Sequence, residues 1–324
     1  MIDPIVTSRA NDGAGSAEVT VIMVSYNTRD LTLKAIETLL ENAGDVSMKL
    51  VVWDNASADG SADAIAAQFP DIELIRSEEN VGFAMANNVV AEKAETEWLL
   101  LLNPDTETYP NAVENLLAFA KANPQAGIVG GRTVFPDGSL NIASCWAKMT
   151  PWSLFCSATG LTNAFPRSGL FNPEAMGNWQ RDTVREVDIV VGCFFLIRTE
   201  LWRELGGFSP RYFMYGEEAD MCLRAARLGY QPMITPDAQI MHLVGAATSK
   251  REDKLRRLLK AKVTLVRDHW SPVTAPIGVG LLLLGAGARR LASSVGSKAG
   301  AGQGREETWK SVWENRKDWL EGYR

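Results

Sequence analysis

The stretch VTVIMVSYN at residues 19–27 and the stretch WLLLLNPD at residues 98–105 share one pattern, an apolar run that ends abruptly in polar residues. Apolar runs of this length are typical of strands buried on both faces of a parallel sheet. Segments with helical spacing alternate with such runs. We therefore predict strands over 19–25, 49–53, 72–76 and 98–102, and helices over 28–42, 61–69, 83–94 and 112–122. This alternation predicts an α/β protein with a doubly wound, mostly parallel sheet.

The second half of the chain has a different pattern. Residues 139–185 are rich in Trp, Pro, Gly and Asn, and we expect them to form a long loop region of functional importance. On either side of this region, the sequence predicts strands over 128–135, 187–197 and 231–243, and helices over 201–205, 219–228 and 254–270.

The composition is that of an ordinary globular protein with one large or two modest domains, since 46% of its 324 residues are hydrophobic and 22% are charged. A net charge of -6 gives no general attraction to nucleic acid, and we expect no such partner. The four cysteines contain no C-x-x-C pair, which favours buried thiols in a reducing compartment. Residues 1–17 show no signal-peptide pattern, so we expect a flexible N-terminus and a cytoplasmic protein.

Polar residues follow each of the first four predicted strands. Because the carboxyl ends of parallel strands meet at one edge of a sheet, these residues are expected to bind a nucleoside and a metal-held diphosphate. Each position alone is equally compatible with a helix cap or a turn, but four in succession favour a ligand site. The residues are Ser25, Tyr26 and Asn27, then Asp54 and Asn55, then Asn80 and Gly82, and then Asn103 and Asp105.

Asp105 is the strongest candidate for a metal ligand. Hard divalent cations take oxygen ligands, often only one or two carboxylates together with phosphate oxygens of the substrate. The alternative is that Asn103-Pro104-Asp105 is only a turn. His242 lies at the end of a predicted strand, and its pattern alone favours a structural role over a ligand role.

The acidic cluster Glu217, Glu218 and Asp220 lies between apolar flanks. An acidic start of a helix explains one carboxylate well but three poorly. A general base needs a carboxylate close to the attacking hydroxyl group, and Glu218 is the candidate. Glu217 or Asp220 would then orient a neighbour or contact the acceptor.

At this point the motifs resemble those of glycosyltransferase family 2, in particular the rhamnosyltransferase-like branch of bacterial surface polysaccharide assembly. The resemblance spans roughly residues 19–248 and rests on the order of the motifs, because none is decisive alone. In chain order the motifs are Val24–Asn27, Asp54–Ser61, Asn80–Asn88, Leu102–Asp105, Val191–Cys193, Gly206–Phe208, Phe213–Asp220 and His242.

The resemblance implies a GT-A fold, a Mg²⁺ or Mn²⁺ cofactor and transfer with inversion from a nucleotide-sugar donor. The donor would be dTDP- or UDP-linked, with dTDP-rhamnose favoured, and the acceptor a glycan or a polyprenyl-linked sugar. Asp105 and His242 would hold the metal ion, and Gly192 and Asp188 would line the acceptor side. The nucleotide-sugar site would consist of Ser25, Tyr26, Asn27, Asp54, Asn55, Asn80, Gly82, Asn87 and Asn103.

Two positions depart from the family pattern. Asn103 replaces the first carboxylate of the usual D-x-D motif, so metal binding would depend on Asp105 and His242. Glu218 stands where many members have an aspartate, which leaves the base to be chosen between Glu217 and Glu218.

We expect a catalytic domain over 18–250, with a nucleotide-sugar half at 18–127 and an acceptor half at 128–250, followed by a helical region at 251–324. Residues 276–288 are apolar but shorter than the roughly 20 residues of a spanning helix. They would contact the cytoplasmic membrane face, form an oligomer contact or be a buried helix.

Two other function classes were weighed. A non-catalytic nucleotide-sugar or carbohydrate-binding protein is the main alternative, although plain binding does not need a spare base near a metal ion. A dinucleotide-dependent oxidoreductase is disfavoured, because no G-x-G-x-x-G follows the first predicted strand.

Overall fold

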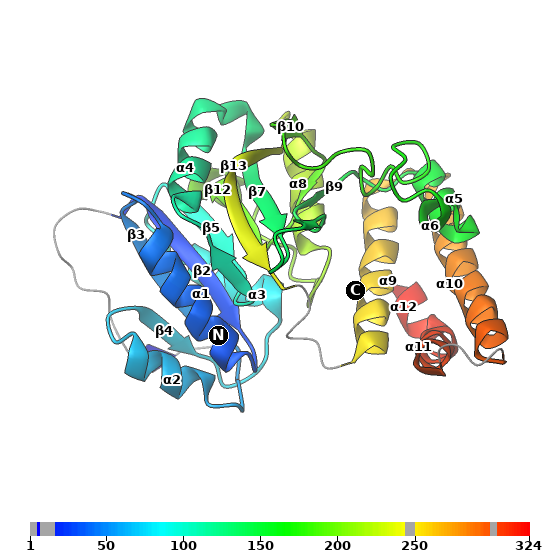
Figure 1. Ribbon diagram of the computed structural model, residues 1–324, viewed down its shortest axis with the longest axis horizontal. Coiled ribbons are helices and arrows are strands. Elements are labelled where there is room, and N and C mark those ends of the chain that lie inside the picture. Colours follow the sequence, from blue (N-terminus) through cyan, green and yellow to red (C-terminus); the bar gives the residue numbers. More distant parts are fainter. Residues whose placement is uncertain (1–4, 7–16, 244–249, 299–302) are drawn as a thin grey trace. The chain divides into compact units, whose positions relative to one another are not determined.

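The computed structural model describes residues 5–6, 17–243, 250–298 and 303–324 (Figure 1). These residues form two compact units. The first, here called the sheet unit, comprises Met1–Trp146, Gln180–Phe213 and Glu217–Ala247. The second, here called the helical unit, comprises Ala147–Trp179, Met214–Gly216 and Thr248–Arg324, and thus contains residues 147–179 besides the predicted C-terminal region.

The first half of the sheet unit is the predicted parallel α/β layer. Its four parallel strands are β2 (Val19–Ser25), β3 (Met48–Asp54), β4 (Glu73–Arg76) and β5 (Trp98–Leu102), and β1 (Ile5–Val6) pairs antiparallel with β4. The helices are α1 (Arg29–Asn42), α2 (Ser61–Gln68), α3 (Phe83–Glu92) and α4 (Ala112–Ala122). Ser25 is opposite Asp54, and Asp54 is opposite Arg76, so the carboxyl ends of the strands are level.

The second half of the sheet unit is mixed. The main sheet runs in the order β1-β4-β3-β2-β5-β12-β7-β13-β10, and β12 is antiparallel to both of its neighbours. The α/β fold class is therefore confirmed, with the parallel pairing concentrated in the first half. The strands added here are β6 (Thr106–Thr108), β7 (Ile128–Val134), β8 (Leu140–Asn141), β9 (Cys145–Trp146), β10 (Arg185–Glu186), β11 (Ile189–Val190), β12 (Phe194–Arg198) and β13 (Met233–His242). The helices are η1 (Pro124–Ala126), α7 (Thr199–Glu204) and α8 (Glu217–Arg227).

Two sequence-based predictions need correction. The strand predicted over 187–197 is two strands, β11 and β12, which a turn at residues 191–193 separates. The loop predicted over 139–185 contains the helices α5 (Pro151–Thr159) and α6 (Leu161–Ala164). A start signal for α5 is present, because Thr150 and Ser153 form a capping box and Pro151 occupies the first turn.

Both faces of the sheet are covered. Alternate residues of β2, such as Val21 and Met23, pack with α1, α2 and α4 in one core that includes Ile36, Ile65 and Leu116. Ile22 and Val24 of β2 and Val51 and Trp53 of β3 are also buried, and α3 contacts these two strands. Burial on both faces explains why these strands are mostly apolar up to the polar residues at their carboxyl ends.

The helical unit has a core of its own. It consists of α5 and α6 together with α9 (Arg251–His269), α10 (Ala275–Lys298), α11 (Gln303–Glu314) and α12 (Arg316–Glu321). Trp319 is fully buried there and packs with Val263 and Leu282. Helix α10 is longer than the predicted segment 276–288, because Arg289 and Arg290 continue the helix and form hydrogen bonds with α5 and α11 rather than ending it.

Candidate active site at the carboxyl edge of the sheet

Asp54, the last residue of β3, is buried at the edge where the parallel strands end. Its Oδ1 accepts a hydrogen bond of 3.0 Å from the amide of Ser57. Its Oδ2 is buried and accepts no hydrogen bond from any residue that the structure describes. A buried carboxylate oxygen without a partner is costly, so this atom is suited to accept a hydrogen bond from a bound ligand.

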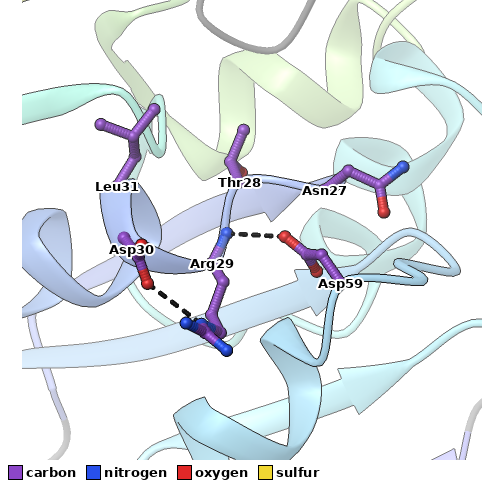
Figure 2. Close-up of a pocket in the computed structure, with 6 residues that line it drawn as sticks. All are labelled: Asn27, Thr28, Arg29, Asp30, Leu31 and Asp59. Carbon is purple, nitrogen blue, oxygen red and sulfur yellow. Dashed lines mark hydrogen bonds and ion pairs between the residues drawn. The ribbon is translucent and has the colours of Figure 1, made fainter.

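The turn after β2 and the loop after β3 are tied together by hydrogen bonds. The amide of Ala58 donates to Asn27 Oδ1 at 2.7 Å, and the amide of Arg29 donates to Asp59 Oδ2 at 2.9 Å. Figure 2 shows Asn27, Arg29 and Asp59 of these residues, which line a hollow. The volume of the hollow is about 370 Å³. Burial tends to raise the pKa of Asp59, but hydrogen bonds from Ser61 and Arg29 outweigh it and lower that pKa, so Asp59 stays ionised and holds the turn. The hollow is lined by Asn27, Thr28, Arg29, Asp30, Leu31 and Asp59.

Ser25 and Tyr26 occupy different environments at this edge. Ser25 is fully buried, and its hydroxyl group forms hydrogen bonds with Thr28 at 3.3 Å and Thr32 at 2.9 Å. Its hydroxyl group is thus engaged in holding the start of α1. Tyr26 is 39% exposed and is accessible from solvent.

Asn55 holds the loop that precedes α3. Its Nδ2 donates to Asn80 Oδ1 at 2.9 Å, and its Oδ1 accepts from the amide of Val81 at 2.9 Å. Asn80 Oδ1 also accepts from the amide of Gly82 at 3.0 Å. The side-chain amide groups of Asn55 and Asn80 therefore hold this loop in its conformation.

Gly82 begins α3 with φ 84° and ψ 173°, a backbone conformation that is essentially restricted to glycine. A Cβ atom at this position would lie 2.3 Å from the carbonyl oxygen of Phe213. That same carbonyl accepts a hydrogen bond of 2.9 Å from the amide of Phe83. On α3, Asn87 is fully buried, and its Nδ2 donates to Phe83 O at 2.8 Å. Its Oδ1 has no hydrogen-bond donor among the described residues.

Asp105 and His242 form a buried pair. Asp105 Oδ1 lies 3.3 Å from His242 Nε2, and both side chains are less than a tenth exposed. The strands β6 and β13 bring them together, because His242 is opposite Thr106, and the amide of Leu243 donates to the carbonyl of Asp105 at 3.0 Å. The structure therefore joins the two predicted metal ligands, which are far apart in the sequence.

The protonation of His242 follows from its surroundings. Burial disfavours the charged imidazole, but Cys193 and the Asp105 carboxylate outweigh it and raise the pKa of His242 to about 10. Its Nδ1 is buried without a hydrogen-bond partner among the described residues. A metal ion bound at Nε2 would take the place of a proton on that nitrogen.

The pair fits an ion that is bound together with a diphosphate. Among the residues that the structure describes, no group of three or more His, Cys, Asp or Glu side chains is arranged to hold a metal ion alone. Mg²⁺ is commonly bound by one or two carboxylates plus substrate phosphates, and imidazole is a ligand for several transition metals. Asn103 supports the turn beside the pair, because its carbonyl accepts a hydrogen bond of 2.7 Å from Thr106 Oγ1.

The acidic cluster forms the first turn of α8. Glu217 and Asp220 are buried, whereas Glu218 is half-buried. Asp220 Oδ2 accepts a hydrogen bond of 2.8 Å from Arg224 Nε, and the guanidinium of Arg224 also donates to the carbonyl oxygens of Leu205 and Gly207. Asp220 therefore ties α8 to the loop before it.

The segment 190–193 links the metal-site pair to the acidic helix. At one end, Cys193 interacts with His242, and its carbonyl accepts a hydrogen bond of 3.1 Å from the amide of Asn103. At the other end, the amide of Val190 donates to Cys222 Sγ at 3.5 Å. Cys222 lies one helical turn after Glu218, and burial with the nearby Glu218 carboxylate raises the pKa of its thiol to about 12.

The predicted acceptor-side residues lie on or beside this segment. Gly192 lies in its turn, where a Cβ atom would be 3.3 Å from the ring of Phe83. Asp188 is half-buried and directly precedes β11. The sequence reasoning missed Cys193 as a neighbour of His242, and also Asn141, whose Nδ2 donates to the carbonyl of His242 at 3.0 Å. The only sequence signal for Cys193 is its position next to Gly192.

Comparison with known proteins identifies the family. Residues 20–206, more than half of the chain, match the sequence profile of glycosyl transferase family 2. The chain belongs to glycosyltransferase family 2. It is 27% identical over 245 residues to an N-acetylglucosaminyl-diphospho-decaprenol L-rhamnosyltransferase of Mycobacterium tuberculosis, with 71% of this chain and 77% of that protein covered. It is 26% identical over 235 residues to rhamnosyltransferase WbbL of Escherichia coli K12, with 69% and 83% covered.

Solved structures share the fold of this family 2 chain. A mannosyltransferase from Pyrobaculum calidifontis in complex with GDP-mannose and Mn²⁺ has a TM-score of 0.57 at 19% identity, with 97% of this chain and 90% of that chain covered. GalNAc-T7 with UDP, GalNAc and Mn²⁺ has a TM-score of 0.52 at 13% identity, with 82% and 56% covered. The predicted GT-A fold and the rhamnosyltransferase-like resemblance are therefore confirmed.

Proposed function

We propose that this glycosyltransferase moves a rhamnosyl group from a dTDP- or UDP-linked donor to a hydroxyl group of a glycan or polyprenyl-linked acceptor in cell-surface polysaccharide synthesis. The observation that carries the proposal is the segment 190–193, which contacts His242 at one end and the helix of Glu218 at the other. This arrangement supports a leaving-group site and a base around one acceptor-side turn. The names of the relatives in Mycobacterium and Escherichia support the sugar and the lipid-linked acceptor.

The donor's nucleoside would lie at the carboxyl edge of β2 and β3. Asp54 Oδ2, buried and without a hydrogen bond among the described residues, would accept a hydrogen bond from the base or the ribose. The exposed ring of Tyr26 would lie against the nucleoside, and Asn87 Oδ1 would accept from the donor or from a water molecule next to it. Ser25, Asn27, Asn55 and Asn80 would act as positioning residues, since each has its polar side chain engaged within the site's own loops.

Asp105 and His242 would hold a Mg²⁺ or Mn²⁺ ion beside the diphosphate. Such an ion supplies positive charge that stabilises the departing diphosphate. Asn103 would keep the β5–β6 turn in place, so that Asp105 Oδ1 and His242 Nε2 both face the ion. The Mn²⁺ in the related mannosyltransferase and in GalNAc-T7 supports a divalent cation here.

Glu218 would remove the proton from the acceptor hydroxyl group, with Glu217 as the other candidate. A base on the face of the sugar opposite the diphosphate leads to a single displacement and therefore to inversion. Glu218 is half-buried in the first turn of α8, and Asp220 in the same turn accepts a hydrogen bond from Arg224. Gly192 and Asp188 would line the acceptor's approach, and the small Gly192 leaves room beside Phe83.

Turnover with defined substrates tests the proposal. The full-length protein would be incubated with a panel of nucleotide sugars, with Mn²⁺ or with EDTA, and with a short-chain polyprenyl-diphospho-N-acetylglucosamine. We expect one added deoxyhexose by mass spectrometry, only with dTDP- or UDP-rhamnose and only without EDTA. The anomeric configuration of the product, read by NMR, should be opposite to that of the donor. Transfer of a different sugar would contradict the proposed donor, and retention would contradict the single displacement.

A non-catalytic binding protein of the same fold would behave differently. Nucleotide sugars would raise its melting temperature, as any ligand of the native state does. However, neither transfer to an acceptor nor slow hydrolysis of the donor would occur with any sugar of the panel. Thermal shift without turnover across the panel would therefore favour this alternative.

A further inference from the structure

The outward face of α10 is apolar along nearly its whole length. Over 275–295, where its side chains are described, no exposed position carries a charge or a hydrogen-bonding side chain. The spacing of three, four and seven residues places these positions on one stripe of the helix. The exposed positions are Pro276, Ile277, Gly280, Leu284, Ala288, Leu291, Ala292 and Val295.

This face differs from those of the neighbouring helices in the same unit. The exposed positions of α9 are Arg251, Arg257, Arg267 and Asp268. On α11 they are Gly304, Arg305, Glu307, Lys310 and Glu314. Solvent-facing positions on α9 and α11 are therefore mostly charged, and the stripe on α10 differs from both of them.

The stripe is long and strongly exposed. Leu284 is 55% exposed and Leu291 is 70% exposed. From residue 276 to residue 295 a helix rises by about 28 Å. Among the described residues, Ala275–Val295 is the one stretch that is long and apolar enough to cross a membrane, with mean hydropathy 1.3.

A second apolar surface lies on the helices that pack against α10. Arg289 of α10 donates to the carbonyl of Ser157 on α5 at 3.0 Å, and Gly285 lies against Ala158. On α5 the rings of Trp152 and Phe155 stack with centroids 5.6 Å apart, and both are exposed. Exposed tryptophan beside aliphatic groups is a common feature of surfaces that enter the boundary of a bilayer.

The two segments that carry these surfaces contain basic residues but no carboxylates of their own, although Arg290 pairs with Glu306 of α11. The chain has 39 acidic residues and a net charge of -6, yet residues 147–173 and 269–305 contain no aspartate or glutamate. The lysines and arginines within these two segments are Lys148, Arg167, Arg289, Arg290, Lys298 and Arg305. A basic segment with an apolar face matches the anionic headgroups and acyl chains of a lipid surface.

We propose that α10, together with α5, lies in the plane of an anionic lipid surface, with the stripe from Ile277 to Val295 inserted at the boundary between headgroups and acyl chains. The proposal deepens the proposed function and rests on it in one respect, since a polyprenyl-linked acceptor is held in a bilayer. It identifies the helical unit as the part of the chain that contacts the cytoplasmic membrane face.

The packing of α10 favours lying in the surface over crossing it. The inward residues Leu282 and Ala286 belong to the core of the helical unit, where they pack with Trp319. A spanning α10 would have to leave this core or carry the charged face of α11 into the bilayer, which is costly.

The charge pattern disfavours a second copy of the chain as the occupant. In a symmetric dimer the same surface meets itself, so the cations of these two segments would face cations, and the two segments themselves supply no carboxylate; Arg290 pairs with Glu306 of α11. Like charges across an interface oppose association. The lipid surface has no such conflict.

Vesicle flotation of the full-length protein tests the proposal. Leu284→Glu with Leu291→Glu changes the stripe, and Leu40→Glu with Leu228→Glu is the matched control, because Leu40 and Leu228 are 47% and 51% exposed in the sheet unit. With vesicles of phosphatidylglycerol and phosphatidylcholine, we expect the wild type and the control to float and the bound fraction of the stripe variant to fall at least tenfold. Equal flotation of both variants, or no flotation of the wild type, would overturn the proposal.

Further measurements separate lipid contact from misfolding and from the other occupants. The four native cysteines are buried, so a fluorophore can be attached selectively at Leu284→Cys, with Leu40→Cys as the control. When vesicles are added, the emission of the fluorophore at residue 284 should shift to the blue, and that of the fluorophore at residue 40 should not. No shift at residue 284 would refute insertion. Light scattering should show that the wild type is a monomer. If the wild type is instead a dimer and the variant with Leu284→Glu and Leu291→Glu is a monomer, the stripe is the contact with a second copy. Alkaline carbonate should release the protein, and retention would indicate a spanning helix.

Failure of this proposal and failure of the proposed function give different results. The stripe variant should transfer sugar to a water-soluble acceptor as fast as the wild type does. Flotation without any transfer would leave the lipid contact standing and refute the function. Sugar transfer without flotation would leave the proposed function standing and refute the lipid contact.

Discussion

Replacing Gly82 with alanine tests how the loop before α3 is held. Gly82 has φ 84° and ψ 173°, and the new Cβ atom would lie 2.3 Å from the carbonyl oxygen of Phe213. That oxygen is backbone, so it cannot move aside as a flexible side chain would. The substitution must shift either the loop or the segment of Phe213, and the hydrogen bond of 2.9 Å between Phe83 N and Phe213 O would be lost or lengthened.

The magnitude follows from two contributions. A non-glycine residue in this backbone region costs about 1–3 kcal/mol. The lost hydrogen bond adds about 1 kcal/mol. We therefore expect Gly82→Ala to lower the free energy of unfolding by about 2–4 kcal/mol, a large part of the roughly 5–15 kcal/mol that a native protein has.

Gly60→Ala is the matched control. Gly60 also has a positive φ, of 80°, but a Cβ atom there would meet nothing within 4 Å. Gly60→Ala should lower the free energy of unfolding by only about 1–2 kcal/mol, because only the left-handed backbone conformation disfavours alanine there. Both variants would be unfolded in urea, and nucleotide affinity would be measured by calorimetry. Gly82→Ala should also weaken nucleotide binding, because Asn55 and Asn80 form hydrogen bonds with this loop.

The outcome that refutes the reasoning is equal destabilisation of the two variants. It would mean that the contact with Phe213 contributes nothing beyond backbone strain. Normal nucleotide affinity in a destabilised Gly82→Ala would separately remove the loop from the donor site.

Three further predictions concern the chemistry of the site. Glu218→Gln should lower kcat about 10²-fold or more with donor affinity nearly unchanged, as measured by steady-state kinetics and calorimetry; near-normal kcat would remove Glu218 from the role of base. Asp105→Ala should abolish the effect of Mn²⁺ on nucleotide affinity, and a Mn²⁺ titration like that of the wild type would contradict the assignment. Burial raises the pKa of the Cys222 thiol to about 12, whereas the thiol of an unfolded chain has a pKa near 8.5. Deprotonation of this thiol therefore favours the unfolded state, and the free energy of unfolding should fall as the pH rises from about 9 to about 12. Urea unfolding across this range should show a weaker pH dependence in Cys222→Ala, and an equal dependence would show that other groups cause it.

The parallel half of the fold could be predicted from the sequence because each strand is buried on both faces. Strands β2 and β5 have the predicted bounds, and α4 does as well. The mixed half was harder, because most of its strands are short and pair with distant segments, although β7 and β13 are long. The turn at 191–193 was predicted as strand interior, since Val191 and Cys193 are as apolar as their neighbours and the single glycine Gly192 was not taken as a break.

The helices α5 and α6 were missed for a related reason. Residues 139–185 have a turn-rich composition, and a local start signal for α5 at Thr150 was overlooked. What stabilises α5 is a distant partner, because α10 packs against it from more than a hundred residues further along the chain. Composition does not report such a partner.

The sequence by itself determined which residue types stand at the carboxyl ends of the strands, because a buried parallel strand must end where polar groups reach the edge of the sheet. Only the tertiary structure decided that Asp105 meets His242 and that Arg224 binds the carbonyl oxygens of Leu205 and Gly207. It also decided that one stripe of α10 faces outward while Leu282 and Ala286 are buried. Side-chain partners depend on pairing between strands and helices that are distant in sequence, and no local pattern of residues encodes those distances.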